Sequence, residues 1–291
     1  MEAVSEKHHA ASSGVVFFVY GVRLPIVAQR FTLIHEDVQL IGEQRLRGPL
    51  HLVFAHGWIS SRRMWDEVLA LLPEQVSYTT FDFRGCGQSD RPVQGHDLLG
   101  YAKDLRAILE TLAVPVVLVG HSMGARVAQY VATQAPANIQ GLILVAPGVA
   151  GSTVVVPRHR ELMVRAYGSR RRIHAFQRGA MVRELAPQVM ERLVDDALLA
   201  QYEHWLGWYD HGRTLDFSAQ LARVTVPVQL IAGEQDPLIP LGRLERELLN
   251  AYPQARLHVI GGAGHNLAVE APNELVESFL TNLHEKFNLT Q

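Results

Sequence analysis

Apolar and polar positions recur along this chain with two different periods, and each period predicts one kind of element. Short runs of β-branched and other apolar residues, bounded by glycine, proline or polar residues, predict strands. These runs lie near residues 30–35, 37–44, 50–55, 78–82, 116–120, 142–146, 228–232 and 256–260. Stretches with apolar residues three or four positions apart predict helices near residues 62–72, 98–113, 123–135, 241–251 and 271–286.

The predicted strands and helices alternate, and the strands from the third onward are almost continuously apolar. Strands that are apolar on both faces are typical of a parallel sheet covered by helices on each side. We therefore predict an α/β fold with a mostly parallel, eight-stranded sheet. One segment interrupts the alternation: about eighty residues between Val145 and the strand at 228–232 show helical periodicity without a strong strand pattern.

Composition limits the possible partners. The chain has 291 residues, 48% of them hydrophobic, which is ample for the core of one large domain or two. A net charge of −2 argues against general binding to nucleic acids or membranes. The lone cysteine, Cys86, excludes an intrachain disulfide, and no apolar run reaches the roughly 18 residues that span a bilayer. We expect a cytoplasmic protein, monomeric or homodimeric, that acts on a small-molecule substrate.

The strand predicted at 116–120 leads into Gly120-His121-Ser122-Met123-Gly124, which matches the pattern G-x-S-x-G. In this pattern the serine occupies a sharp turn between a strand and a helix, which lifts its hydroxyl clear of the sheet. The turn strains the backbone, so the residues two before and two after the serine must be small, as Gly120 and Gly124 are. Ser122 is therefore the candidate nucleophile.

A serine hydroxyl is a poor nucleophile at neutral pH, so it needs a base and a third group that orients the base. Asp236 follows the predicted strand at 228–232, and His265 lies in the glycine-rich loop after the strand at 256–260. Nucleophile, acid and base in this chain order are the arrangement used by hydrolases that carry this turn. We predict that Ser122, Asp236 and His265 form a catalytic triad.

These residues resemble the α/β-hydrolase superfamily, and the resemblance covers roughly residues 30 to 286. Three further segments match its motifs: His56-Gly57-Trp58, the run from Phe81 to Pro92 and Glu270-Ala271-Pro272. The resemblance implies the α/β-hydrolase fold with a helical lid inserted into the core. It also implies that the backbone N–H groups of Trp58 and Met123 form an oxyanion hole, which stabilises charge in the transition state.

The resemblance divides the chain into a core of residues 29–147 and 218–291 and a helical lid of residues 148–217. Residues 1–28 match no part of the pattern and are expected to form a flexible N-terminal extension. The lid contains a group of arginines, for which we favour a solvent-facing or ion-paired role over a substrate clamp: Arg158, Arg160, Arg165, Arg170, Arg171, Arg172, Arg178 and Arg183.

The lid also contains an aromatic group, which consists of Tyr202, His204, Trp205, Trp208 and Tyr209. Helical spacing would place Tyr202, Trp205 and Tyr209 on one face. Combining this group with the two motif loops, we predict that the substrate pocket is lined by His56, Trp58, His121, Trp205 and Trp208.

Several polar residues have plainer interpretations. His56 and His121 are more often structural groups that order the loops of these motifs. Asp82 and Arg84 are expected to fix the loop that follows their strand, and Asp104 and Glu110 to be surface acids without a role. No metal-ligand spacing occurs, so neither a metal nor a cofactor is expected.

The resemblance implies a serine hydrolase that cleaves a carboxylic ester, thioester or lactone of a small, mainly hydrophobic substrate through an acyl-enzyme. Carbon–carbon bond hydrolysis, perhydrolase or lyase chemistry, and a ligand receptor with weak turnover remain alternatives. Serine at position 122 disfavours dehalogenases and epoxide hydrolases with an aspartate nucleophile. Ala146-Pro147-Gly148 disfavours oxygenases similar to the quinaldine dioxygenases, which have their acid after the sixth strand.

Overall fold

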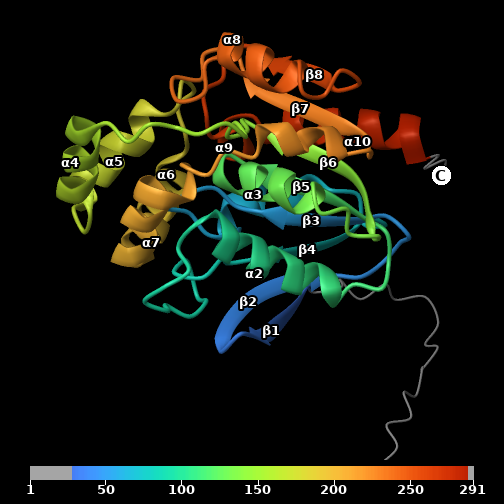
Figure 1. Cartoon of the computed structure of the whole chain (residues 1–291), viewed down its shortest axis with the longest axis horizontal. Helices are drawn as coiled ribbons and strands as arrows, with labels where there is room; N and C mark the ends of the chain where they lie inside the picture. Colours follow the sequence, from blue (N-terminus) through green and yellow to red (C-terminus); the bar gives the residue numbers. More distant parts are fainter. Residues whose placement is uncertain (1–27, 288–291) are drawn as a thin grey trace, which may run out of the picture.

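Eight strands form one continuous sheet at the centre of the molecule (Figure 1). The computed structural model describes residues 28–287, so the predicted extension lies outside the described residues, apart from Ala28. The sheet order is β1-β2-β4-β3-β5-β6-β7-β8. The strands are β1 (Gln29–His35), β2 (Val38–Arg45), β3 (His51–Ala55), β4 (Ser77–Phe81), β5 (Val116–His121), β6 (Ile139–Val145), β7 (Val228–Gly233) and β8 (Arg256–Ile260).

The sheet is parallel from β4 to β8, whereas β1 and β2 run antiparallel to their neighbours. Glu36 and Asp37 join β1 to β2 with positive φ angles of 48° and 62°. Two consecutive residues with positive φ are typical of the tight turn of an antiparallel hairpin. Every residue of β3, β4 and β5 is buried, because helices cover both faces of the sheet. The predicted α/β-hydrolase fold is thus confirmed.

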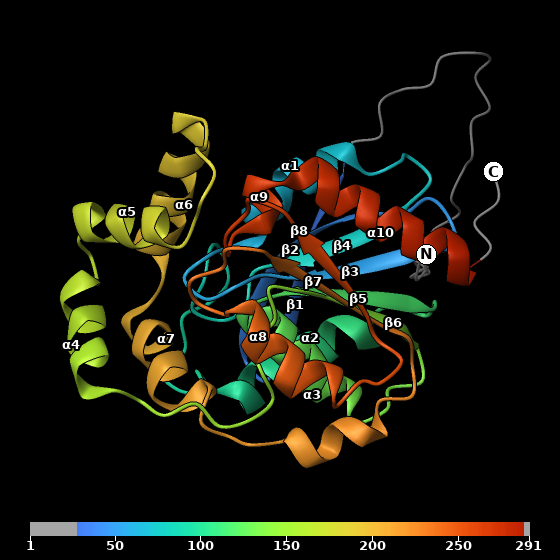
Figure 2. The ribbon, with the colours of Figure 1, turned by 90° about the horizontal axis from the view of Figure 1, so that it is seen from above.

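Helices lie in two layers, one on each side of the sheet (Figure 2). One layer contains α1 (Asp66–Leu71), α9 (Leu267–Glu270) and α10 (Pro272–Phe287), and the other contains α2 (Leu98–Glu110), α3 (Met123–Ala132) and α8 (Leu241–Leu244). Each interface has its own apolar cluster: Phe54, Trp65 and Phe279 belong to one, and Leu105 and Val127 to the other.

Several predicted elements differ from those observed, and three of them have a clear cause or form. The strand predicted at 142–146 begins earlier, at Ile139, because pairing with β5 extends it through Gln140 and Gly141, which break the apolar pattern. The helix predicted at 98–113 ends at Glu110, shortly before Pro115, which cannot continue a helix. The helix predicted at 241–251 splits into α8 and a π-helical turn at 245–249.

Between β6 and β7 the chain leaves the sheet and forms a separate group of helices at one end of the molecule, at the left in Figures 1 and 2. This helical insertion contains α4 (Pro157–Ala166), α5 (Arg170–Gly179), α6 (Pro187–Leu199) and α7 (Tyr202–Gly207), with a π-helical turn at 208–212. Proline opens both α4 and α6, where its missing N–H costs nothing. Ile173, Val194 and Trp205 pack together with Ile59 of the core.

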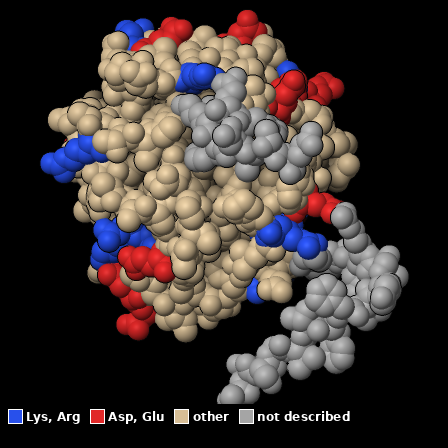
Figure 3. Space-filling view, turned by 90° about the vertical axis from the view of Figure 1, so that its right-hand side faces the viewer, with Lys and Arg blue, Asp and Glu red and all other residues tan. Residues whose placement is uncertain are grey.

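The face of the molecule opposite the insertion carries basic and acidic side chains in small separate groups on a mostly uncharged surface (Figure 3). This mixture agrees with the small net charge of the chain. Among residues 28–287, no helix has the length and apolar character needed to cross a bilayer.

Candidate active site

Ser122 occupies the turn between β5 and α3 with φ 50° and ψ −106°. A positive φ is strained for a residue with a side chain, and such strain is held in place by the surrounding structure. A Cβ atom on Gly120 would lie 2.6 Å from the Ala125 backbone, and one on Gly124 would lie 2.3 Å from the carbonyl oxygen of Ala55. Both positions therefore require glycine, for the steric reason predicted from the sequence.

The structure brings the three predicted catalytic side chains together in one hydrogen-bond chain. His265 Nε2 lies 2.9 Å from Ser122 Oγ, and His265 Nδ1 lies 2.7 Å from Asp236 Oδ2. The carboxylate only accepts, so the imidazole proton sits on Nδ1, and Nε2 accepts from the serine hydroxyl. Asp236 Oδ1 accepts the backbone N–H groups of Leu238 and Ile239 at 2.8 and 2.9 Å, which fixes the carboxylate.

The loop that carries His265 is held by the buried carboxylate of Glu270. The N–H of Gly264 donates to Oε2 at 3.0 Å, and the N–H of Asn266 donates to Oε1 at 3.0 Å. These are the two residues that flank His265, so one carboxylate fixes the backbone on both sides of the histidine. The sequence shows the position of Glu270 but not this role, because both bonds are made to backbone atoms.

The same carboxylate ties the histidine loop to the helical insertion. Glu270 Oε2 also accepts the N–H groups of Val182 and Arg183, at 2.8 and 3.1 Å, from the segment between α5 and α6. The backbone N–H of His265 donates to the carbonyl oxygen of Ala180 at 2.8 Å. The insertion therefore contributes to the position of the imidazole as well as to the walls of the site.

His56 and His121 support the site from behind. His121 donates Nε2–H to the carbonyl oxygen of His265 at 2.9 Å, and burial lowers the pKa of His121 to about 3, which keeps its ring neutral. His56 donates Nδ1–H to Gly57 O at 2.8 Å and accepts the N–H of Phe83 at 3.0 Å. Neither ring lines the cavity at Ser122. Both nitrogens of His56 and one nitrogen of His121 hold backbone groups of these loops, whereas the buried Nδ1 of His121 has no hydrogen-bond partner. Their assignment to the pocket was wrong, and the structural interpretation holds.

Trp58 and Met123, the predicted oxyanion-hole residues, both line the cavity beside Ser122. Met123 is the first residue of α3, so its N–H has no acceptor within the helix. The loop before Trp58 packs closely on the serine turn, since a Cβ atom on Gly57 would lie 2.6 Å from His121 Nδ1.

The cavity next to Ser122 and His265 has a volume of about 440 Å³ and mostly apolar walls. The core contributes Trp58, Met123, Leu238 and Ile239, and the insertion contributes Val149, Leu162, Met163, Phe176, Trp208 and Tyr209. Trp58 and Trp208 line it as predicted. Trp205 does not: it lies behind Trp58, with ring centroids 5.4 Å apart, and donates its Nε1–H to Met163 O at 3.0 Å. Tyr202 is exposed and does not line the cavity.

None of the eight arginines between Arg158 and Arg183 lines this cavity. Several form ion pairs instead: Arg160 with Asp210, Arg165 with Glu161, Arg170 with Glu191 and Asp195, and Arg183 with Glu274. The preference for a solvent-facing or paired role was therefore correct. Three other arginines line the cavity, namely Arg126, Arg213 and Arg243, and sequence reasoning missed them. The sequence contains one sign of this basic lining, because Arg126 is a charged residue in the apolar run that follows the candidate nucleophile.

Two buried ion pairs fix the loop after β4. Asp82 Oδ2 accepts from Arg62 Nη1 at 2.5 Å, and Arg84 Nε and Nη2 donate to Asp104 Oδ1 at 2.9 and 2.5 Å. The expected loop-fixing role of Asp82 and Arg84 is thus confirmed. The prediction for Asp104 was wrong, because it is fully buried and burial raises its pKa against the opposing effect of Arg84. Glu110 is exposed, as expected.

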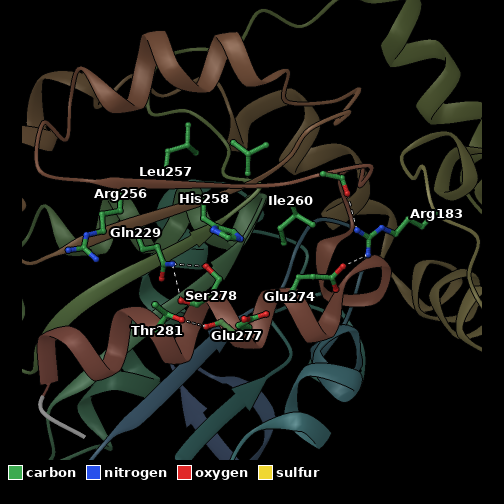
Figure 4. Close-up of a pocket in the computed structure, with 12 residues that line it drawn as sticks. Arg183, Gln229, Arg256, Leu257, His258, Ile260, Glu274, Glu277, Ser278 and Thr281 are labelled. Atoms are coloured by element: carbon green, nitrogen blue, oxygen red, sulfur yellow. Dashed lines mark hydrogen bonds and ion pairs between the residues drawn. The ribbon is translucent and has the colours of Figure 1, made fainter.

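A second hollow, of about 560 Å³, lies beside β8 and α10 (Figure 4). Arg183 reaches it from the insertion, with Nη1 2.7 Å from Glu274 Oε1 and Nη2 donating to Gly261 O at 2.9 Å. None of the predicted catalytic residues lines this hollow, so the candidate site is the cavity at Ser122. Within the described part of the chain, no group of three or more His, Cys, Asp or Glu side chains is placed to hold a metal ion.

The sequence pattern described as "Alpha/beta hydrolase family" matches residues 52–278, and the chain belongs to this family. A non-heme chloroperoxidase from Streptomyces lividans is 28% identical over 253 residues, which cover 79% of this chain and 90% of the relative. A 3-oxoadipate enol-lactonase from Acinetobacter baylyi is 25% identical over 195 residues, which cover 64% of this chain and 72% of the relative. The solved structure of a bromoperoxidase from Bacillus anthracis has a TM-score of 0.79 at 21% identity, covers 88% of this chain and 99% of that one, and shares the fold.

Proposed function

We propose that this protein is a serine hydrolase that cleaves a carboxylic ester, thioester or lactone of a small, mainly hydrophobic substrate through an acyl-enzyme. The observation that carries the proposal is the continuous chain from Ser122 Oγ through His265 to Asp236, with contacts of 2.9 and 2.7 Å, beside a largely apolar cavity. Membership of the alpha/beta hydrolase family and the similarity to an enol-lactonase support it.

In the first half of the proposed reaction, His265 Nε2 takes the hydroxyl proton as Ser122 Oγ attacks the substrate carbonyl carbon. The resulting imidazolium is stabilised by Asp236, and the oxyanion accepts hydrogen bonds from the N–H groups of Trp58 and Met123. Each such donor typically contributes roughly 3 to 4 kcal/mol to stabilising the transition state. The alcohol or thiol then leaves with the proton that His265 returns, and the acyl group stays on Ser122.

In the second half, water enters and His265 takes one of its protons as the oxygen attacks the acyl carbonyl. Collapse of the tetrahedral intermediate breaks the bond to Ser122 Oγ, and His265 returns the proton to the serine. A lactone follows the same path, with the leaving hydroxyl remaining attached to the product.

We assign residues 29–147 and 218–291 to the catalytic core and residues 148–217 to a lid. Side chains of the insertion, such as Phe176 and Trp208, form one wall of the cavity, which supports this assignment. A wall of this kind excludes water from the acyl-enzyme and selects substrates by shape.

Perhydrolase chemistry is the second candidate, and the 28% identity to a chloroperoxidase favours it. In that reaction hydrogen peroxide replaces water in the second half, so the product is a peracid formed from the same acyl-enzyme. Measuring peracid against free acid at increasing peroxide concentration separates the two outcomes. A receptor with weak turnover would bind a ligand tightly and release almost no product.

A series of p-nitrophenyl esters of increasing acyl length tests the main proposal. We expect turnover that depends on Ser122 and an accumulated acyl-enzyme detectable by intact mass. Ser122→Ala should remove the activity, whereas Ser152→Ala, an exposed serine near the start of the insertion, should leave it unchanged. Undiminished turnover by Ser122→Ala would overturn the proposal, and tight binding without turnover would favour the receptor.

A further inference from the structure

The cavity at Ser122 has a basic lining in addition to its apolar walls. Arg126 from α3, Arg213 after the π-helical turn, Arg243 from α8 and His159 from α4 all line it. Among the described residues that line it, none is aspartate or glutamate. Arginines from three separate parts of the chain thus line the cavity that holds the candidate nucleophile, and Arg213 and Arg243 lie close enough to Arg126 to act on its charge.

Arg126 is the most unusual member of this group because it is 98% buried. Its Nη1 donates to Gly151 O at 3.0 Å and its Nη2 to Leu215 O, while its Nε, also buried, has no hydrogen-bond partner. No carboxylate forms an ion pair with it among residues 28–287. Burial lowers its pKa to about 10, which reflects the cost of keeping this charge out of water.

Arg213 is half-buried and lacks a carboxylate partner within the described residues. Its Nε donates to Tyr209 O at 3.1 Å, and its guanidinium carbon lies 3.9 Å from the centre of the Tyr209 ring. These contacts hold the guanidinium in place and leave its two terminal nitrogens as donors. Arg243 differs, since its Nε is 2.8 Å from Glu247 Oε1.

Anchoring alone does not explain the charge on Arg126. Its two contacts tie Gly151 and Leu215, the beginning and end of the insertion, to α3. A neutral donor would satisfy those two carbonyl oxygens without a buried charge, and an unpaired buried charge is costly. Arg213 and Arg243 add to this cost by repulsion, and Asp216 and Glu247 offset part of it. Among these groups the three arginines outnumber the two carboxylates, so the surroundings of Arg126 keep an excess of positive charge.

We propose that this basic lining binds a carboxylate of the substrate, with Arg126 and Arg213 as its partners, while the scissile carbonyl lies at Ser122. The inference rests on the proposed function and specifies its substrate class: an ester, thioester or lactone with an apolar body and one carboxylate. Guanidinium groups match a carboxylate through paired N–H donors, and one negative charge neutralises the excess. The apolar walls at Trp58 and Phe176 hold the body between the two ends.

The test compares p-nitrophenyl hemiglutarate and hemiadipate with the neutral valerate and hexanoate esters of matched length. The measured quantity is the ratio of kcat/KM for the anionic ester to that for its neutral partner. We expect this ratio to exceed one in the wild type and to fall by about 10- to 100-fold in Arg213→Gln and Arg126→Gln. Arg171→Gln, an exposed arginine of α5 that does not line the cavity, should leave the ratio unchanged.

Binding provides a second measurement that does not need turnover. Ser122→Ala should bind monomethyl adipate more tightly than methyl hexanoate in calorimetry, and adding Arg213→Gln should remove the difference. Arg213 is half-buried, so this variant keeps the test valid if Arg126→Gln fails to fold. A ratio at or below one that the variants do not change, with equal binding of both esters, overturns the inference. Ser122-dependent turnover of neutral esters would still support the proposed function in that case.

Discussion

The backbone N–H of His265 donates to the carbonyl oxygen of Ala180 at 2.8 Å, which joins the proposed base to the helical insertion. Glu270 strengthens this junction by accepting N–H groups from both segments. A motion of the insertion that breaks these bonds would therefore move the imidazole. Under the proposed function, these few bonds would couple substrate selection by the insertion to proton transfer at Ser122.

Replacing Glu270 tests this coupling. Glu270→Gln exchanges one acceptor oxygen for an NH₂ group, which faces N–H donors, so the histidine loop loses at least one anchor. We expect kcat to fall by about 10- to 100-fold, because small displacements of a catalytic group cost that much. KM should change little, since Glu270 does not line the cavity. Ester hydrolysis and the rate of fluorophosphonate labelling of Ser122, both measured on folded protein, should fall in parallel.

Glu274→Gln is the matched control, because Glu274 lies about one turn further along and pairs with Arg183 near the surface. Its kcat should stay within about twofold of the wild type, as partly exposed ion pairs contribute little. Equal losses in both variants, or full kcat in Glu270→Gln, would show that the carboxylate does not position His265.

Buried histidines should make the protein less stable in acid. Burial lowers the pKa of His51 from 6.5 to about 4 and that of His121 to about 3. Between these values and 6.5 the unfolded chain binds protons that the native state does not. The contribution of the two neutral rings to stability is therefore fully present above pH 6.5 and is lost as the pH falls. Each histidine adds a slope of up to about 1.4 kcal/mol per pH unit. Burial raises the pKa of Asp66 to about 6, so below pH 6 its carboxyl group binds a proton more readily in the native state than in the unfolded chain. This proton uptake stabilises the native state as the pH falls and offsets part of the slope.

Urea unfolding between pH 6.5 and 5 measures this slope. His51→Gln keeps a polar group near Thr79 Oγ1, which lies 2.8 Å from His51 Nε2, and should make the slope shallower by up to about 1.4 kcal/mol per pH unit. His174→Gln, at an exposed position on α5, serves as the control and should leave the slope as it is. Identical slopes in wild type and His51→Gln would contradict the assignment of a buried neutral ring.

The serine turn was predictable because its constraints are local: a strand, five residues and a helix contain all of them. Asp236 and His265 followed from topology, since parallel strands end at one edge of the sheet. The ion pair between Arg84 and Asp104 was not predictable in the same way. Its members lie 20 residues apart on a loop and a helix, and only packing reveals that Asp104 is buried.

The cavity lining was the least predictable part of the site. His56 and His121 belong to the two motifs, but three of their four ring nitrogens hold backbone groups, which a sequence does not show. Arg126 lies within the predicted helix at 123–135, and its position on the cavity wall depends on where the insertion leaves and rejoins the core. Side-chain direction at such positions is set by tertiary contacts between residues that are far apart in the chain.

Covalent labelling of Ser122 tests the central claim most directly. Wild-type protein treated with a fluorophosphonate should gain one adduct, and peptide mass spectrometry should place it on Ser122. Ser122→Ala should remain folded, lose the adduct and lose ester hydrolysis by on the order of 10⁶ in kcat. An adduct on another residue, or a Ser122→Ala variant that still hydrolyses esters at the wild-type rate, would contradict the account.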